Sequence, residues 1–140
     1  MLPNTAENYL FGDCNVFALA AKDILKCRIV CLLEHRFITS GSNSGVKESL
    51  IHCFVKVSET HGFDARGVRP IASILDEYLD PPELSIPFWF SDEKSDREIL
   101  DYGYATTGGS VVIDIANARS YILENLFEDI ESVRNSSKNL

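Results

Sequence analysis

The segment Gly12-Asp13-Cys14-Asn15-Val16-Phe17-Ala18-Leu19-Ala20-Ala21 contains the start of the first helix that the sequence predicts. Gly12 and Asp13 supply a helix breaker and an N-cap residue immediately before Cys14. The apolar residues that follow at near-helical spacing are Ala18, Leu19, Ala21, Ile24 and Leu25. We therefore expect a helix from about Cys14 to Lys26, with a cysteine in its first turn.

Short apolar runs after this helix predict a small antiparallel sheet. One strand is expected over residues 28–33 and a second over residues 50–57, with a flexible Ser- and Gly-rich loop at 40–45 between them. A tight connection at 58–62 then leads into a third strand at 63–65, antiparallel to the second.

The remaining elements complete an α+β prediction. Pro70 is expected to start a helix that runs to about Leu79, because proline is tolerated in a first turn. Residues 110–113 resemble another short strand, and Asp114 is expected to cap a closing helix over residues 115–133. The apolar stripe of that helix would be Ile115, Ala118, Tyr121, Ile122, Leu126 and Ile130. The predicted architecture is a Cys-bearing N-terminal helix packed on the sheet, with one helix after Pro70 and one at the C-terminus. Residues 1–134 would form one domain, followed by a polar tail at 135–140.

Composition narrows the classes of function. The chain has 140 residues, 45% of them hydrophobic, and a formal net charge of −8, which predicts a globular protein that nucleic acids and anionic membranes would repel. Its apolar runs are too short to span a bilayer, and no signal peptide is visible at the N-terminus. We therefore expect a cytoplasmic protein whose partner is a protein, a peptide or a neutral small molecule. The oligomeric state does not follow from the sequence.

Cys14, His52 and Asp64 form the candidate catalytic set. A cysteine attacks as its thiolate, which both a helix N-terminus and a neighbouring imidazole stabilise. Cys14 would use the first effect and His52, within the predicted strand at 50–57, would supply the second. In a hairpin with the next strand, Asp64 would lie within reach of His52 and hold its tautomer. A shift of one residue in register would turn Asp64 to the opposite face.

With these residues the chain resembles papain-like and transglutaminase-like thiol enzymes, in which a cysteine begins the central helix and a histidine and an Asp or Asn follow from adjacent strands. The resemblance covers residues 8–64, and implies an oxyanion-binding amide six residues before the cysteine and a glycine two before it. Asn8 and Gly12 occupy those positions, with Asn where Gln is usual. The short spacing from Cys14 to His52 is similar to that in small bacterial deamidase and peptidase domains. The pattern Gly-Asp-Cys-x-x-Phe-Ala with a later His and Asp-Ala-Arg-Gly resembles that of a group of small bacterial and phage proteins. The resemblance implies a cysteine peptidase, glutamine deamidase or transglutaminase that needs no cofactor.

Several alternatives remain open at the level of the sequence. Cys14 and His52 would both be ordinary core residues if the order were accidental. A pairing of Arg66 with Asp64 would leave only a Cys–His dyad. Cys27, Cys31 and His35 are spaced by four, which on a helix would form a metal-ligand stripe, although the segment favours a strand and we predict no metal site. The rival function is a catalytically silent acidic protein that inhibits a partner through surface contacts.

Overall fold

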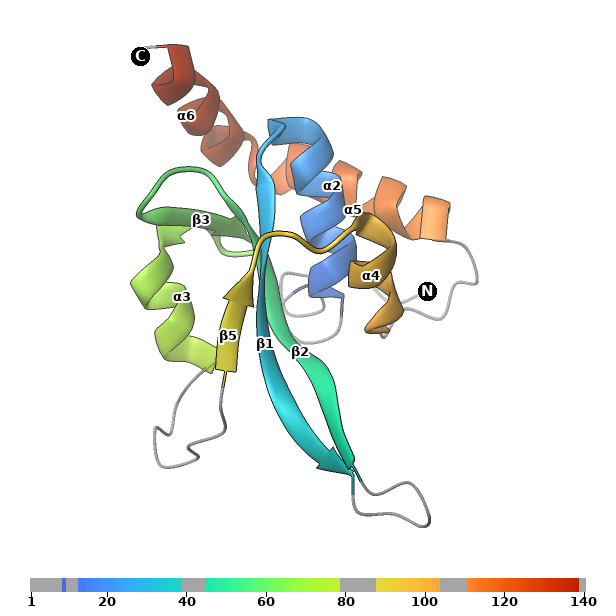
Figure 1. The fold of residues 1–140 in the computed structure, drawn as a ribbon. Helices are drawn as coiled ribbons and strands as arrows, with labels where there is room; N and C mark the ends of the chain where they lie inside the picture. The colour runs from blue at the N-terminus through green and yellow to red at the C-terminus, as the bar shows by residue number, and fades with distance from the viewer. Residues whose placement is uncertain (1–8, 10–12, 39–44, 79–87, 104–110, 139–140) are drawn as a thin grey trace.

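The computed structural model describes residues 9, 13–38, 45–78, 88–103 and 111–138, and confirms the α+β prediction (Figure 1). The described strands form one antiparallel sheet in the order β4-β3-β2-β1-β5. These strands are β1 (Arg28–Ile38), β2 (Gly45–Lys56), β3 (His61–Asp64), β4 (Gly67–Pro70) and β5 (Phe88–Ser91). The described helices are α2 (Cys14–Leu25), α3 (Ile71–Tyr78), α4 (Asp96–Asp101), α5 (Val111–Asn125) and α6 (Phe127–Lys138).

Helix α2 is the central element of the core. Most of its residues are buried between the sheet and α5, which explains why its apolar positions extend beyond a single stripe (Figure 1). Asp13 occupies the predicted N-cap position, although its side chain makes no capping hydrogen bond. The helix ends one residue before the predicted boundary, because Lys26 adopts a left-handed conformation with φ 58° and its N–H bonds to the carbonyl of Lys22.

The two faces of β2 contact different helices, because successive side chains of a strand point to opposite sides of the sheet. Cys53 and Val55 belong to the large core beneath α2. Phe54 instead clusters with Val30 and with Ile74 of α3 on the opposite face. The sheet therefore separates α2 and α5 from α3 (Figure 1).

Predictions for the second half of the chain need correction. Residues 111–113, predicted as a strand, begin α5, and Asp114 lies within the first turn of that helix rather than capping it. The helix predicted over 115–133 is two helices, and α6 continues to Lys138 through residues predicted as a tail. The short Val-Val-Ile run misled the prediction, since a run of this length does not distinguish a strand from a helix. The predicted apolar stripe is nevertheless inward-facing, because Ala118, Ile122 and Ile130 are buried.

Three short elements were not predicted. Residues 67–70 form β4, so Pro70 ends a strand and α3 starts at Ile71 rather than at Pro70. Residues 88–91 form β5, which pairs with β1 at one edge of the sheet. Ser95 and Glu98 make a reciprocal capping box at the start of α4.

Candidate active site

The start of α2, which carries Cys14, is anchored by the neighbouring Asn15. The Asn15 side chain is completely buried, and its Nδ2 donates to the carbonyl oxygens of Ile99 at 3.2 Å and Gly103 at 2.9 Å. These bonds tie the first turn of α2 to α4 and to the residues just after it. Sequence analysis did not identify Asn15 as important, and its only signal was an amide within an otherwise apolar helix.

The β2–β3 hairpin brings His52 and Asp64 together. The two strands pair only where Val55 and Lys56 face β3, so the part of β2 that carries His52 has no ladder partner in the described part of β3. Beyond the last pair of this β2–β3 ladder, His52 Nε2 and Asp64 Oδ2 form a hydrogen bond of 3.1 Å. Both side chains are about 1% exposed, so the bond is shielded from water.

Three donors hold the Asp64 carboxylate. Its Oδ2 accepts from His52 and from Nη2 of Arg69 at 3.0 Å, and its Oδ1 accepts from the backbone N–H of Arg66 at 2.9 Å. Burial raises the pKa of Asp64, but the bonds from His52 and Arg66 and the charge of Arg69 outweigh it and hold the pKa below its usual range. The alternative in which Arg66 draws Asp64 away from His52 is wrong, because the Arg66 guanidinium pairs with Glu77 at 3.0 Å.

The His52 ring is held on its face as well as at its edge. It stacks on Tyr78 of α3, with ring centroids 4.1 Å apart and planes inclined by 13°. Its second nitrogen, Nδ1, is buried and makes no hydrogen bond with any described residue. Burial lowers the pKa of His52, but Asp64 and the adjacent Cys14 thiol raise it to a net value above the ordinary one.

Cys14 lies next to this imidazole. The two groups interact closely enough to shift each other's pKa, although the Cys14 thiol and Nδ1 do not meet the geometry of a hydrogen bond here. The thiol and backbone N–H of Cys53, together with His52, lower the pKa of Cys14 well below its usual value despite its burial. Cys14 is buried, with 9% of its surface exposed, and His52 and Asp64 are buried more completely.

The other three cysteines behave differently. Burial raises the pKa of Cys27, of Cys31 to about 12, and of Cys53. Cys31 and Cys53 face each other across β1 and β2 in the core beneath α2. Cys14 is therefore the one thiol of the four whose surroundings lower its pKa.

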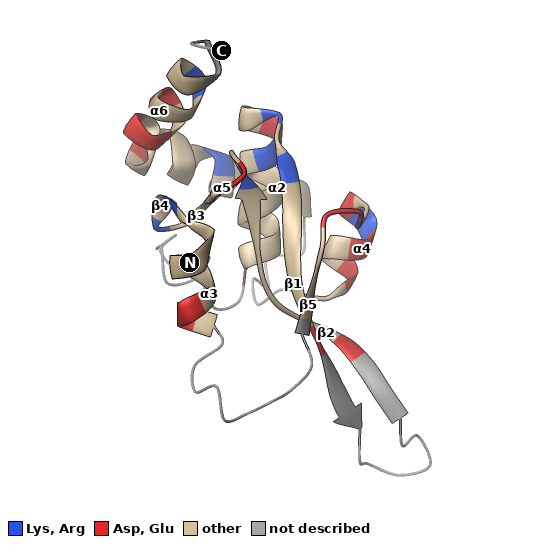
Figure 2. Cartoon of the chain, turned by 60° about the vertical axis from the view of Figure 1, so that its left-hand side comes forward, with Lys and Arg blue, Asp and Glu red and all other residues tan. Residues whose placement is uncertain are grey.

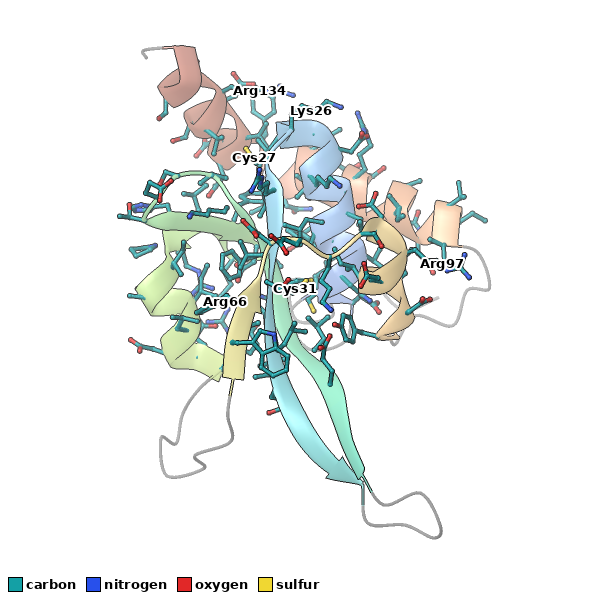
Figure 3. All side chains as sticks on the ribbon, in the orientation of Figure 1. Lys26, Cys27, Cys31, Arg66, Arg97 and Arg134 are labelled. Carbon is teal, nitrogen blue, oxygen red and sulfur yellow. The ribbon has the colours of Figure 1, made fainter. Side chains whose placement is uncertain are left out.

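The helical metal stripe considered for Cys27, Cys31 and His35 does not exist. Cys31 and His35 lie within β1, and Figure 3 shows Cys27 near the C-terminal end of α2, well apart from Cys31 along the sheet. Within residues 9, 13–38, 45–78, 88–103 and 111–138, no cluster of histidine, cysteine or carboxylate side chains has an arrangement that could hold a metal ion.

Asn8 and Gly12, which the resemblance assigns to the approach to Cys14, lie outside the described residues. The cysteine, histidine and aspartate that the sequence analysis selected are thus brought together.

Comparisons with protein-family models, with curated protein sequences and with solved structures gave no match for this chain. None of the described helices combines the length and apolar character needed to cross a bilayer.

Proposed function

We propose that this protein is a thiol-dependent acyl-transfer enzyme of the papain-like or transglutaminase-like kind, acting on amide or thioester bonds of a protein or peptide. One observation carries the proposal: beside a cysteine at a helix start lies a buried imidazole, with one nitrogen held by a carboxylate and the other without a hydrogen bond to any described residue. A core histidine normally has both ring nitrogens satisfied, so an unpartnered Nδ1 in this position favours a functional role.

The roles of the residues follow from these contacts. Asp64 accepts a hydrogen bond from the Nε2–H of His52, which leaves Nδ1 as the nitrogen that takes the proton of Cys14. The resulting thiolate is stabilised by the imidazolium, by the N-terminal end of α2 and by the Cys53 N–H. The Cys14 thiol and His52 Nδ1 are not within hydrogen-bond geometry in this structure. This is compatible with proton transfer between them, because catalytic hydrogen bonds often tighten only when substrate binds.

Acylation would proceed through attack of the Cys14 thiolate on the substrate carbonyl carbon. The tetrahedral intermediate collapses, and His52 returns its proton to the leaving amine or thiol. Water or a second amine then attacks the thioester on Cys14 while His52 removes a proton from the attacking group, and the carbon–sulfur bond breaks to release the Cys14 thiolate. Attack by water gives a peptidase or a glutamine deamidase, and attack by an amine gives a transglutaminase.

Alkylation of the four cysteines by iodoacetamide as a function of pH tests the first step. Each labelled position is read by mass spectrometry after digestion. Cys27 is the internal control, because it is more exposed than Cys14 but has a raised pKa. If accessibility alone governs the reaction, Cys27 labels first. If the thiolate forms as proposed, Cys14 labels faster than Cys27 at pH 6 and loses that advantage in His52→Gln.

A second experiment tests acyl transfer itself. The protein is mixed with a panel of peptide thioesters and glutamine-containing peptides, with and without methylamine, and the intact mass of the protein is followed. An acyl adduct that maps to Cys14 and is absent in Cys14→Ala supports the proposal, and the fraction of product carrying methylamine separates hydrolysis from transfer. Slow labelling of Cys14 together with no adduct would refute the enzyme and leave the acidic binding protein as the better interpretation.

A further inference from the structure

Arg69 of β4 contacts the candidate triad through the Asp64 carboxylate. Its Nη2 donates to Asp64 Oδ2 at 3.0 Å, and its Nη1 pairs with Glu77 of α3. The side chain is 20% exposed, so most of it is covered by protein. In Figure 2, β4, whose single basic residue is Arg69, and the neighbouring α3, which carries Asp76 and Glu77, both lie at the left of the view.

The β3–β4 register explains how Arg69 reaches Asp64. Arg69 lies directly opposite Gly62, and Asp64 lies directly opposite Gly67. The arginine and the aspartate are therefore diagonal neighbours, at a spacing that a long side chain can bridge. Because both facing residues are glycines, no side chain stands between the guanidinium and the carboxylate.

We propose that Arg69 is a positioning residue for the reaction: it holds the Asp64 carboxylate and offsets part of its negative charge, and thereby sets how firmly His52 keeps its proton. This inference rests on the proposed function, in which His52 must both accept a proton from Cys14 and release it to the leaving group. If the buried Asp64 carboxylate were paired only with His52, its full negative charge would hold the proton on His52 too strongly for release to the leaving group.

How strongly His52 holds its proton depends on every charged or titratable group that faces the His52–Asp64 pair. Among the described residues these groups are Cys14 on α2, Cys53 on β2, Arg69 on β4, and Glu77 and Tyr78 on α3. Arg69 is the cation among them that bonds directly to Asp64. Arg66 contributes its backbone N–H to Asp64 but directs its guanidinium to Glu77, as its position beside α3 in Figure 3 illustrates.

The size of the effect follows from the shared oxygen. His52 Nε2 at 3.1 Å and Arg69 Nη2 at 3.0 Å bond to the same Oδ2, so the two cationic groups lie within about 6 Å of each other. At that distance two unit charges interact by the equivalent of about two pH units at an effective dielectric constant of about 20. Glu77 and the partial exposure of Arg69 weaken the interaction, and we expect about one pH unit to remain.

Histidine titration by ¹⁵N NMR measures this effect directly, since the chain has only three histidines and His52→Gln assigns the signals. Removing the charge in Arg69→Met should raise the pKa of His52 by about one unit. Arg69→Gln, which keeps an amide donor, should raise it similarly and replaces the methionine variant if that one does not fold. Arg69→Lys should restore most of the wild-type value. Arg66→Met is the matched control, because it removes an arginine from the same network without removing a side-chain bond to Asp64.

The outcomes are distinct. An unchanged or lowered pKa of His52 in a folded neutral variant, or an equal rise in Arg66→Met, overturns the role of Arg69. The alkaline limit of Cys14 acylation should shift upwards by the same amount as the pKa. If wild-type Cys14 labels no faster than Cys27, the proposed function fails whatever Arg69 does to His52.

Discussion

Replacement of Asp64 by asparagine is the sharpest test of the buried network. The substitution keeps the size of the side chain and removes its charge, while three donors continue to point at the site. Hydrogen bonds to charged groups contribute about 1 kcal/mol more than neutral ones, and all three bonds are made to the charged Asp64 carboxylate. We therefore expect Asp64→Asn to lower the free energy of unfolding by about 2 to 3 kcal/mol at pH 7. The larger loss of about 3 to 5 kcal/mol that follows when a buried charge is left alone is not expected, because Arg69 keeps Glu77 as a partner.

The stability lost in Asp64→Asn should also depend on pH, in a direction that the pKa of Asp64 determines. The folded-state pKa of Asp64 is depressed, so the stability that it contributes is fully present above its unfolded pKa of about 3.9 and is lost as the pH falls through its folded pKa. The difference between wild type and Asp64→Asn should accordingly be largest near neutral pH and shrink below about pH 4.

Urea denaturation followed by fluorescence of Trp89, the single tryptophan, measures both quantities. Asp114→Asn is the matched control, since Asp114 is also buried but its Oδ2 makes no hydrogen bond with a described residue. We expect the control to cost about 1 kcal/mol or less. A loss below about 0.5 kcal/mol for Asp64→Asn at pH 7, or a loss that is the same at pH 7 and pH 3, would refute the argument.

Three further substitutions test the fold by the same urea assay. Gly67→Ala should lower the free energy of unfolding by about 2 to 4 kcal/mol, because Gly67 has φ +97° and an added Cβ would lie 2.4 Å from Asp129 Oδ2. Adding Asp129→Ala to this variant should recover only the part of the loss that is due to the clash. Ser95→Ala should cost about 1 kcal/mol through loss of the capping box of α4, and no loss would mean that this helix does not depend on its cap. Phe17→Ala should lower the free energy of unfolding by about 3 to 5 kcal/mol, since Phe17 is 1% exposed. Phe90 is 45% exposed, and Phe90→Ala should lower it by less than about 1 kcal/mol. Similar losses for the two variants would contradict the assignment of the core.

The contrast between α2 and α5 shows where local sequence is sufficient. Helix α2 has a breaker, an N-cap residue and a long apolar pattern next to each other, and its predicted start at Cys14 agrees with the structure. Helix α5 begins in a Val-Val-Ile run that follows Gly109 and Ser110 in the sequence, and Val112 in this run is 78% exposed. Because β-branched residues favour strands, local preference pointed to a strand where the chain is helical.

The sequence by itself determined the Cys14 helix, the strand that carries His52 and the alternation of its faces, because these features depend on neighbours a few residues apart. Only the tertiary structure decided whether Asp64 faces His52, since a slip of one residue in the hairpin would have reversed it. The contribution of Arg69 was likewise invisible, because it requires the β3–β4 register and the packing of α3 against it. Side chains that approach from separate strands and helices are brought together by packing of the whole domain, which no local pattern encodes.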